Sequence, residues 1–132
     1  MNHIINIIQT VPSLEELHLG HNALGFEGGN MLAKELATNR TLKVLDLQWN
    51  QIRKNTAKSI CKALGENQTL WALNLSWNGL GQEGCIELAQ SLKKNTKLVD
   101  LNVSSNRIDM TSLRFLLHGL VQNQSLKYFQ MG

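Results

Sequence analysis

The segment "LDLQWNQI" at residues 45–52 recurs with substitutions as "LNLSWNGL" at residues 73–80. In both copies leucines alternate with polar residues, and a tryptophan then stands directly before an asparagine. This alternation predicts a short strand with one buried face. Trp49 and Trp77 therefore fall where each strand is expected to turn toward water, an uncommon place for so large an apolar side chain.

The recurrence extends along most of the chain with a period of 28 residues. One leucine column and two asparagine columns keep this spacing. They comprise Leu14, Leu42, Leu70, Leu98 and Leu126; Asn22, Asn50, Asn78 and Asn106; and Asn39, Asn67, Asn95 and Asn123. Three registers maintained over four copies predict a repeat architecture.

Each unit begins with apolar residues at its first, fourth and sixth places, such as Leu42, Leu45 and Leu47. A helical pattern follows the turn, as at Leu88 and Leu92 in the third unit. The predicted order within a unit is therefore strand, turn and helix. We expect a helical half-repeat at 1–13, four full units at 14–41, 42–69, 70–97 and 98–125, and a terminal strand at 126–132.

One unit cannot bury its apolar face alone, so the units are expected to stack. Neighbouring strands lie about 4.8 Å apart, whereas packed helices need about 8–10 Å. The stack must therefore curve. The sequence predicts an α/β solenoid, a curved horseshoe fragment with a parallel β-sheet on the concave side and α-helices on the convex side.

The pattern L-x-x-L-x-L-x-x-N-x-L, then a Gly-rich turn and L-A-x-x-L-x-x-N, resembles the leucine-rich repeat. Its 28-residue form is similar to ribonuclease inhibitor and to the recognition domains of NOD-like receptors. The resemblance covers residues 14–132 and implies a fold more than a function. We expect the first asparagine column to satisfy turn backbone groups and the second to close each helix in a left-handed conformation.

Composition narrows the class of protein. The chain has 132 residues, a formal charge of +3 and no run of five basic residues, which disfavours nucleic acid binding. No apolar stretch is long enough for a membrane span, and no signal peptide is evident, so we expect no membrane association and a cytoplasmic protein. No polar cap is visible at either end, so we expect either a slice of a longer array or self-association through the ends.

The third, fifth and seventh places of each unit should face the concave side, with the eighth at its rim. Trp49 and Trp77 share the eighth place in adjacent units, so their rings should be roughly 5 Å apart. Trp71, at a second place, is expected to pack near the strand entrance. The candidate partner-binding residues are Glu16, His18, Asp46, Gln48, Trp49, Asn74, Ser76, Trp77, Asp100 and Asn102.

The third, fifth and seventh places hold acidic residues but no lysine or arginine. A partner with a basic surface is therefore favoured. Glu16, His18 and Asp46 could converge on a metal ion, but polar residues on an exposed sheet need none, and we expect no metal or cofactor. Cys61 and Cys85 should be buried free thiols. The G-x-x-G of "LGFEGG" and "LGQEGC" is interpreted as backbone geometry in a turn rather than a phosphate site.

No Ser/His/Asp or Cys/His arrangement is apparent, so the sequence favours a non-catalytic scaffold that binds a protein or peptide on its concave face. Two alternatives stay open. One is a regulatory activator of a small GTPase, acting through the loop edge that carries Arg53, Lys54 and Arg107. The other is a structural or oligomerisation segment of a larger repeat protein. Shielding of the asparagine turn by Trp49 and Trp77 is the structural alternative to their role as contact anchors.

Overall fold

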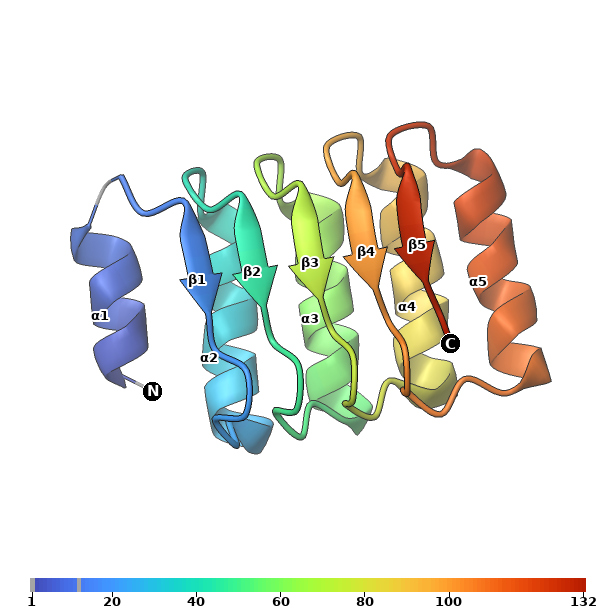
Figure 1. Cartoon of the computed structure of the whole chain (residues 1–132), viewed down its shortest axis with the longest axis horizontal. Helices are drawn as coiled ribbons and strands as arrows, with labels where there is room; N and C mark the ends of the chain where they lie inside the picture. Colours follow the sequence, from blue (N-terminus) through green and yellow to red (C-terminus); the bar gives the residue numbers. More distant parts are fainter. Residues whose placement is uncertain (1, 12) are drawn as a thin grey trace.

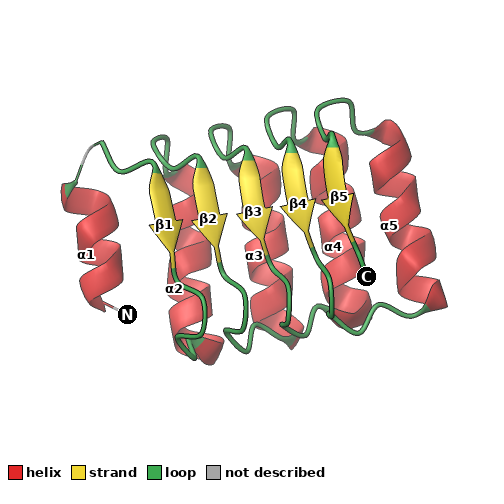
Figure 2. Ribbon diagram, viewed as in Figure 1, coloured by secondary structure: helices red, strands yellow, loops and turns green. Residues whose placement is uncertain are grey.

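The computed structural model describes residues 2–11 and 13–132. Met1 and Pro12, which belong to the predicted half-repeat 1–13, lie outside the described residues. Helices and strands alternate along the chain (Figures 1 and 2). In order they are α1 (Asn2–Thr10), β1 (Glu16–His18), α2 (Gly25–Thr38), β2 (Val44–Asp46), α3 (Lys54–Glu66), β3 (Ala72–Asn74), α4 (Gly81–Lys94), β4 (Asp100–Asn102), α5 (Met110–Gln122) and β5 (Tyr128–Gln130).

The strands form one parallel sheet in the order β1-β2-β3-β4-β5. Each strand residue pairs with the residue 28 positions later, as in Leu45 with Leu73 and Asp46 with Asn74. This register follows from the sequence, because a shift by one residue would turn every buried leucine to the solvent face.

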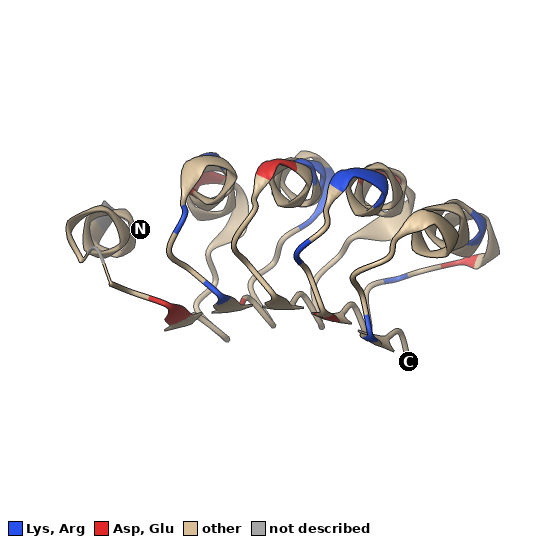
Figure 3. Ribbon diagram, turned by 90° about the horizontal axis from the view of Figure 1, so that it is seen from above, with Lys and Arg blue, Asp and Glu red and all other residues tan. Residues whose placement is uncertain are grey.

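The helices form a second layer on one side of the sheet. Seen from above, the row of helices is longer than the row of strands and arches over it (Figure 3). Because helices need more lateral space than strands, the sheet lies on the inside of the curve. The predicted solenoid with a concave parallel sheet is confirmed.

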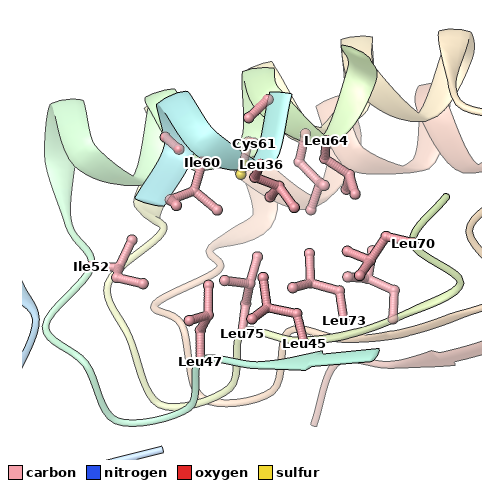
Figure 4. Packing of buried hydrophobic residues seen from close by; sticks show 14 of the residues in the cluster. Leu36, Leu45, Leu47, Ile52, Ile60, Cys61, Leu64, Leu70, Leu73 and Leu75 are labelled. Carbon is pink, nitrogen blue, oxygen red and sulfur yellow. The ribbon is translucent and has the colours of Figure 1, made fainter. Parts of the chain in front are cut away.

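The core lies between these two layers (Figure 4). Leu45, Leu47 and Leu75 from the strand segments are at most 1% exposed and face Ile60 and Leu64 of α3. Burying a side chain of this size contributes about 1.5–3 kcal/mol. The same core includes Ile8 of α1, Leu32 and Leu36 of α2, Leu88 and Leu92 of α4, and Leu116 of α5.

The first asparagine column forms a hydrogen-bonded ladder under the turns. The buried Asn50 donates through Nδ2 to the carbonyls of Leu19 and Leu47 at 2.7 and 3.1 Å. Its Oδ1 accepts from the backbone N–H groups of Asn22 and Leu24 at 3.1 and 3.2 Å. One side chain thus satisfies backbone groups in two neighbouring units, and the predicted structural role is confirmed.

The second asparagine column closes the helices in a different way from the prediction. Asn67 follows α3 with φ −73° and ψ 138°, so its backbone is extended and not left-handed. Its Oδ1 accepts from the N–H groups of Thr69 and Leu70, while Nδ2 donates to the carbonyls of Leu36 and Asn39. An extended backbone lets the amide reach both units, so no left-handed residue is required.

Glycine is needed at three places for different reasons. Gly25 and Gly81, at φ +61° and +58°, adopt the left-handed backbone of the turn into α2 and α4, which confirms the interpretation of the Gly-rich segments. A Cβ at Gly119 of α5 would collide with the backbone of Ala89 in α4. This glycine therefore allows the two helices to approach closely.

Candidate functional site

The concave sheet face holds most of the predicted site residues. Glu16 and His18 are exposed at the β1 edge, whereas Asp46, Asn74, Asp100 and Asn102 are half-buried along the middle strands. The face is hollowed over β2, β3 and β4, with a cavity volume of about 250 Å³. This concave hollow is lined by His18, Val44, Leu45, Asp46, Ala72, Leu73, Asn74, Asp100, Asn102 and Gln130.

Several polar side chains lie close together at one side of the hollow. The imidazole of His18 lies between two carboxylates, with Nε2 3.4 Å from Glu16 Oε1 and Nδ1 4.0 Å from Asp46 Oδ2. Gln48 donates from its side-chain amide to Asp46 Oδ2 at 3.1 Å. The predicted convergence of Glu16, His18 and Asp46 is confirmed, and the side chains of Glu16 and His18 stay 65% and 61% exposed.

The tryptophans at the eighth places are stacked. Their ring centroids are 4.5 Å apart with planes inclined by 10°. This confirms the predicted aromatic pair. The rings remain 45% exposed at Trp49 and 50% exposed at Trp77, so neither indole lies inside the core.

His21 extends the stack by one ring, which the sequence prediction missed. Its imidazole centroid is 5.6 Å from that of Trp49, with an interplanar angle of 17°. The signal was present in the sequence, because His21 holds the eighth place of the first unit. We call His21, Trp49 and Trp77 the aromatic row.

The backbone holds the aromatic row in a conformation that bulky residues rarely adopt. The φ angles of His21, Trp49 and Trp77 are 60°, 55° and 56°. Each peptide N–H nevertheless continues the parallel ladder, as in Trp49 N–H to the Ser76 carbonyl at 3.2 Å. The asparagine ladder begins at the next residue, so turn geometry and ring position are fixed together.

Two predicted side-chain positions are wrong. Ser76 is only 4% exposed, and its hydroxyl donates to Asn74 Oδ1 at 2.7 Å. A short side chain at the seventh place bends back toward the strand, so Ser76 orients Asn74 instead of offering a contact itself. Trp71 is 45% exposed, although packing was expected. The second place lies before β3 and outside the core.

Charge is distributed unevenly between the two faces. Acidic Asp46 and Asp100 line the hollow, whereas Lys and Arg are visible over the helix layer in Figure 3. Arg53 and Arg107 are exposed on the loop edge beyond the aromatic row. The concave face is therefore acidic even though the whole chain carries a formal charge of +3.

The two cysteine thiols lie in the core of the protein. Cys61 and Cys85 are buried free cysteines, as predicted. Burial raises the pKa of the Cys61 thiol and raises the pKa of Cys85 to about 11, so both are protonated and unreactive at neutral pH. Among residues 2–11 and 13–132, no group of three or more His, Cys, Asp or Glu side chains has an arrangement for a metal ion.

None of the helices in the described part of the chain combines the length and hydropathy needed to cross a membrane.

The sequence matches the Leucine Rich repeat family four times, at residues 12–33, 38–61, 66–89 and 94–116. These matches span most of the chain and coincide with the repeated strand and helix segments. The chain therefore belongs to the leucine-rich repeat family.

Similar solved structures share this fold at low sequence identity. The structure of leiomodin-1 actin-binding site 2 superposes with a TM-score of 0.90 and 18% identity, covering 99% of this chain and 78% of that one. The tropomodulin C-terminal domain from Caenorhabditis elegans gives a TM-score of 0.85 and 16% identity, covering 99% of this chain and 81% of that one. No curated protein sequence matches the chain.

Proposed function

We propose that this protein is a non-catalytic recognition scaffold that binds a protein partner across the concave hollow and the adjoining aromatic row. The observation that carries this proposal is the exposed tryptophan stack at the rim of an acidic, hollowed sheet face. Tryptophan is enriched where protein interfaces concentrate their binding energy. The aliphatic core residues repeat, while the outward residues differ from unit to unit, as expected for a surface that recognises one particular partner.

The backbone at the aromatic row favours a binding role over simple shielding. A bulky residue at positive φ costs about 1–3 kcal/mol. Ser105 occupies the equivalent place of the fourth unit at φ 58° without a ring, although Asn106 beside it is 1% exposed, as buried as Asn50 beside Trp49. Asn78, beside Trp77, is only half-buried. Shielding of the turn therefore does not require an aromatic side chain, and the presence of two indoles calls for another reason.

Actin is the first partner to test, because a structural neighbour is named as an actin-binding site. At 18% identity this similarity supports the fold, and actin enters only as a candidate. We also place the protein in the ribonuclease-inhibitor-like subclass of the family on the basis of its 28-residue units, with the resemblance to NOD-like receptor domains as part of that proposal. A cytoplasmic location is part of the same proposal, because actin is the first candidate partner.

The experiment measures binding to purified monomeric actin by calorimetry. It compares the native chain, the single variant Trp77→Ala and the double variant Trp49→Ala/Trp77→Ala. We expect Trp77→Ala alone to weaken binding by about 2 kcal/mol or more, because it removes a large contact area from the interface. Trp71→Ala is the matched control, since Trp71 is equally exposed but lies away from the row.

Thermal unfolding of the same variants separates the two roles of the tryptophans. Weaker binding with unchanged unfolding supports the recognition role. Loss of folding in the double variant would instead favour shielding. If actin does not bind, the same variants are tested on partners captured by the native chain.

The loop edge supports a second candidate, regulation of a small GTPase. Arg53, Lys54 and Arg107 are exposed there, and an exposed arginine can stabilise the charge that develops during GTP hydrolysis. The Arg53 side chain packs beside Gly79, which leaves Arg107 as the freer group. Measuring GTP hydrolysis by a panel of small GTPases with the native chain and with Arg107→Ala tests this function, and unchanged turnover by the native chain excludes it for that panel.

A further inference from the structure

The aromatic row ends at Trp77, whose indole stacks on Trp49 on one side and on no other ring among the described residues. Trp77 is half exposed, and the eighth place of the next unit is Ser105, whose side chain is too short to cover an indole. Among the described residues, the ring contacts run from His21 to Trp49 to Trp77 and end there. The position over Ser105 continues the row, in which centroids are 4.5 to 5.6 Å apart, but among the described residues no further aromatic ring stacks there.

We propose that this position takes an arginine side chain from an extended basic segment of the partner protein, with its guanidinium stacked on the open face of Trp77. This inference rests on the proposed function and specifies the chemistry of the partner. A guanidinium is planar and cationic, so it meets both the flat geometry and the negative face of the indole.

The surrounding charges favour a basic partner segment and determine on which side of Trp77 that segment lies. Asp46 and Asp100 lie in the concave hollow, and Glu16 is exposed beside it. The outward strand columns carry no lysine or arginine, whereas Arg53 and Arg107 lie on the loop edge beyond the row. A basic segment is therefore expected to run from Trp77 over the sheet and not outward past the loops.

The distance between the row and the hollow sets a spacing for the partner. The eighth place is three residues beyond the fifth place, which is roughly 10 Å along a strand. An extended peptide covers that distance in about three residues. A second basic residue two to four positions from the stacked arginine would then lie near the carboxylate of Asp46. Asp100 is at a third place, five residues from the eighth, so a basic residue about five positions away would be needed to reach it.

The test uses short peptides, blocked at both ends, with a basic residue at every second position and glycine or serine between. One peptide carries arginine, a second carries lysine, and a third carries citrulline, which keeps the planar shape without charge. Binding is followed by NMR of the isotope-labelled native chain, in which the indole N–H signals of Trp49, Trp71 and Trp77 report separately. A single-stranded oligonucleotide forms a fourth arm, because nucleobases also stack on indoles.

We expect the arginine peptide to shift the Trp77 indole signal and the amides of the concave strands together. A guanidinium lays its plane on the ring whereas an ammonium is a point charge, so lysine should bind a few-fold more weakly. Citrulline lacks the charge, which over an exposed ring contributes a factor of about two to five in affinity, so it should bind more weakly still. Ser105→Leu should abolish the preference for arginine over lysine, because the aliphatic side chain covers the open face without offering a new ring face, while both native rings remain. Trp71→Ala should change nothing.

The outcomes that overturn the inference differ from those that overturn the proposed function. If the arginine peptide shifts only concave strand amides and Ser105→Leu has no effect, the stacking inference is wrong while the proposed surface stands. Stronger stacking by the oligonucleotide than by the arginine peptide also overturns it. If no peptide affects either the strands or the row, both the stacking site and the basic-partner surface are wrong.

Discussion

At the scale of single residues, the buried asparagines of the ladder are expected to contribute strongly to the free energy of unfolding. Asn50 is fully buried, and its amide satisfies backbone groups of two units. In Asn50→Ala, several buried carbonyls and N–H groups lose their partners, so we expect the free energy of unfolding to fall by about 3 kcal/mol. Urea denaturation of the native chain and the variant measures this difference.

Asn22→Ala is the matched control for that prediction. Asn22 has the same place in the first unit and also donates to two carbonyls, but it is solvent-exposed. Water can replace its hydrogen bonds, so its loss should cost far less. Equal destabilisation by the two substitutions would contradict the view that burial makes the ladder strong.

Side-chain positions are where sequence reasoning was least complete. The stacking of Trp49 on Trp77 could be predicted, because equal places in adjacent units must be neighbours. The burial of Ser76 could not, because a hydroxyl can turn toward solvent or back to Asn74 with little change in volume. The stacking of His21 on Trp49 could not be predicted from their shared column alone, because an imidazole at the edge of the sheet can also turn to solvent.

At the scale of elements, α5 differs from α2, α3 and α4 in having a side-chain N-cap. Asp109 accepts a hydrogen bond from the backbone N–H of Ser112 at 2.8 Å, which lowers the pKa of its carboxyl below the ordinary value of 3.8. Because this pKa is lower in the folded state, the stabilisation is complete above pH 3.8 and is lost as the pH falls through the folded value.

The pH prediction is tested with Asp109→Asn, which caps the helix but does not titrate there. We expect the native chain to unfold at a higher temperature than the variant near neutral pH, since a charged carboxylate also favours the helix N-terminus. That difference should shrink below about pH 4. A difference in unfolding temperature that stays constant down to acid pH would show that the charge of Asp109 contributes nothing.

The elements themselves could be predicted from the sequence because the repeat supplies each pattern four times. The strand places were correct at Leu45 and Leu73, where the period of two and the period of 28 agree. The helix ends were predicted at the right residue but with the wrong backbone, since Asn67 closes α3 in an extended conformation. Asparagine at the end of a helix often adopts a left-handed backbone. Here the hydrogen bonds of its side chain to the neighbouring unit favour the extended backbone instead.

At the scale of the whole molecule, the charges are divided between the sheet layer and the helix layer. The formal charge of +3 alone suggests a basic surface, yet the inward sheet face carries Asp46 and Asp100, and the helices carry most of the lysines. Only the repeat register reveals this distribution, because it assigns every residue to a face. We therefore expect association with a basic partner to be faster at low ionic strength.

The outer face of α5 leaves apolar side chains uncovered. Val121 is 82% exposed and Leu117 is 47% exposed, beside a hollow that also involves Arg114 and His118. At the opposite end, Ile7 of α1 is 47% exposed. In a stacked array such faces are covered by a neighbouring unit, and a second copy of this chain presents surfaces of the same kind.

We therefore expect copies of the chain to associate through these end faces as the protein concentration rises. Val121→Lys should shift the association toward the monomer, because it places a charge in the centre of the contact. Phe26→Lys is the matched control, since Phe26 is also exposed but lies on α2 away from either end. Sedimentation equilibrium at several concentrations measures both variants. A native chain that stays monomeric at the highest concentration would show that these faces do not hold copies together, because self-association through them must grow with concentration by mass action.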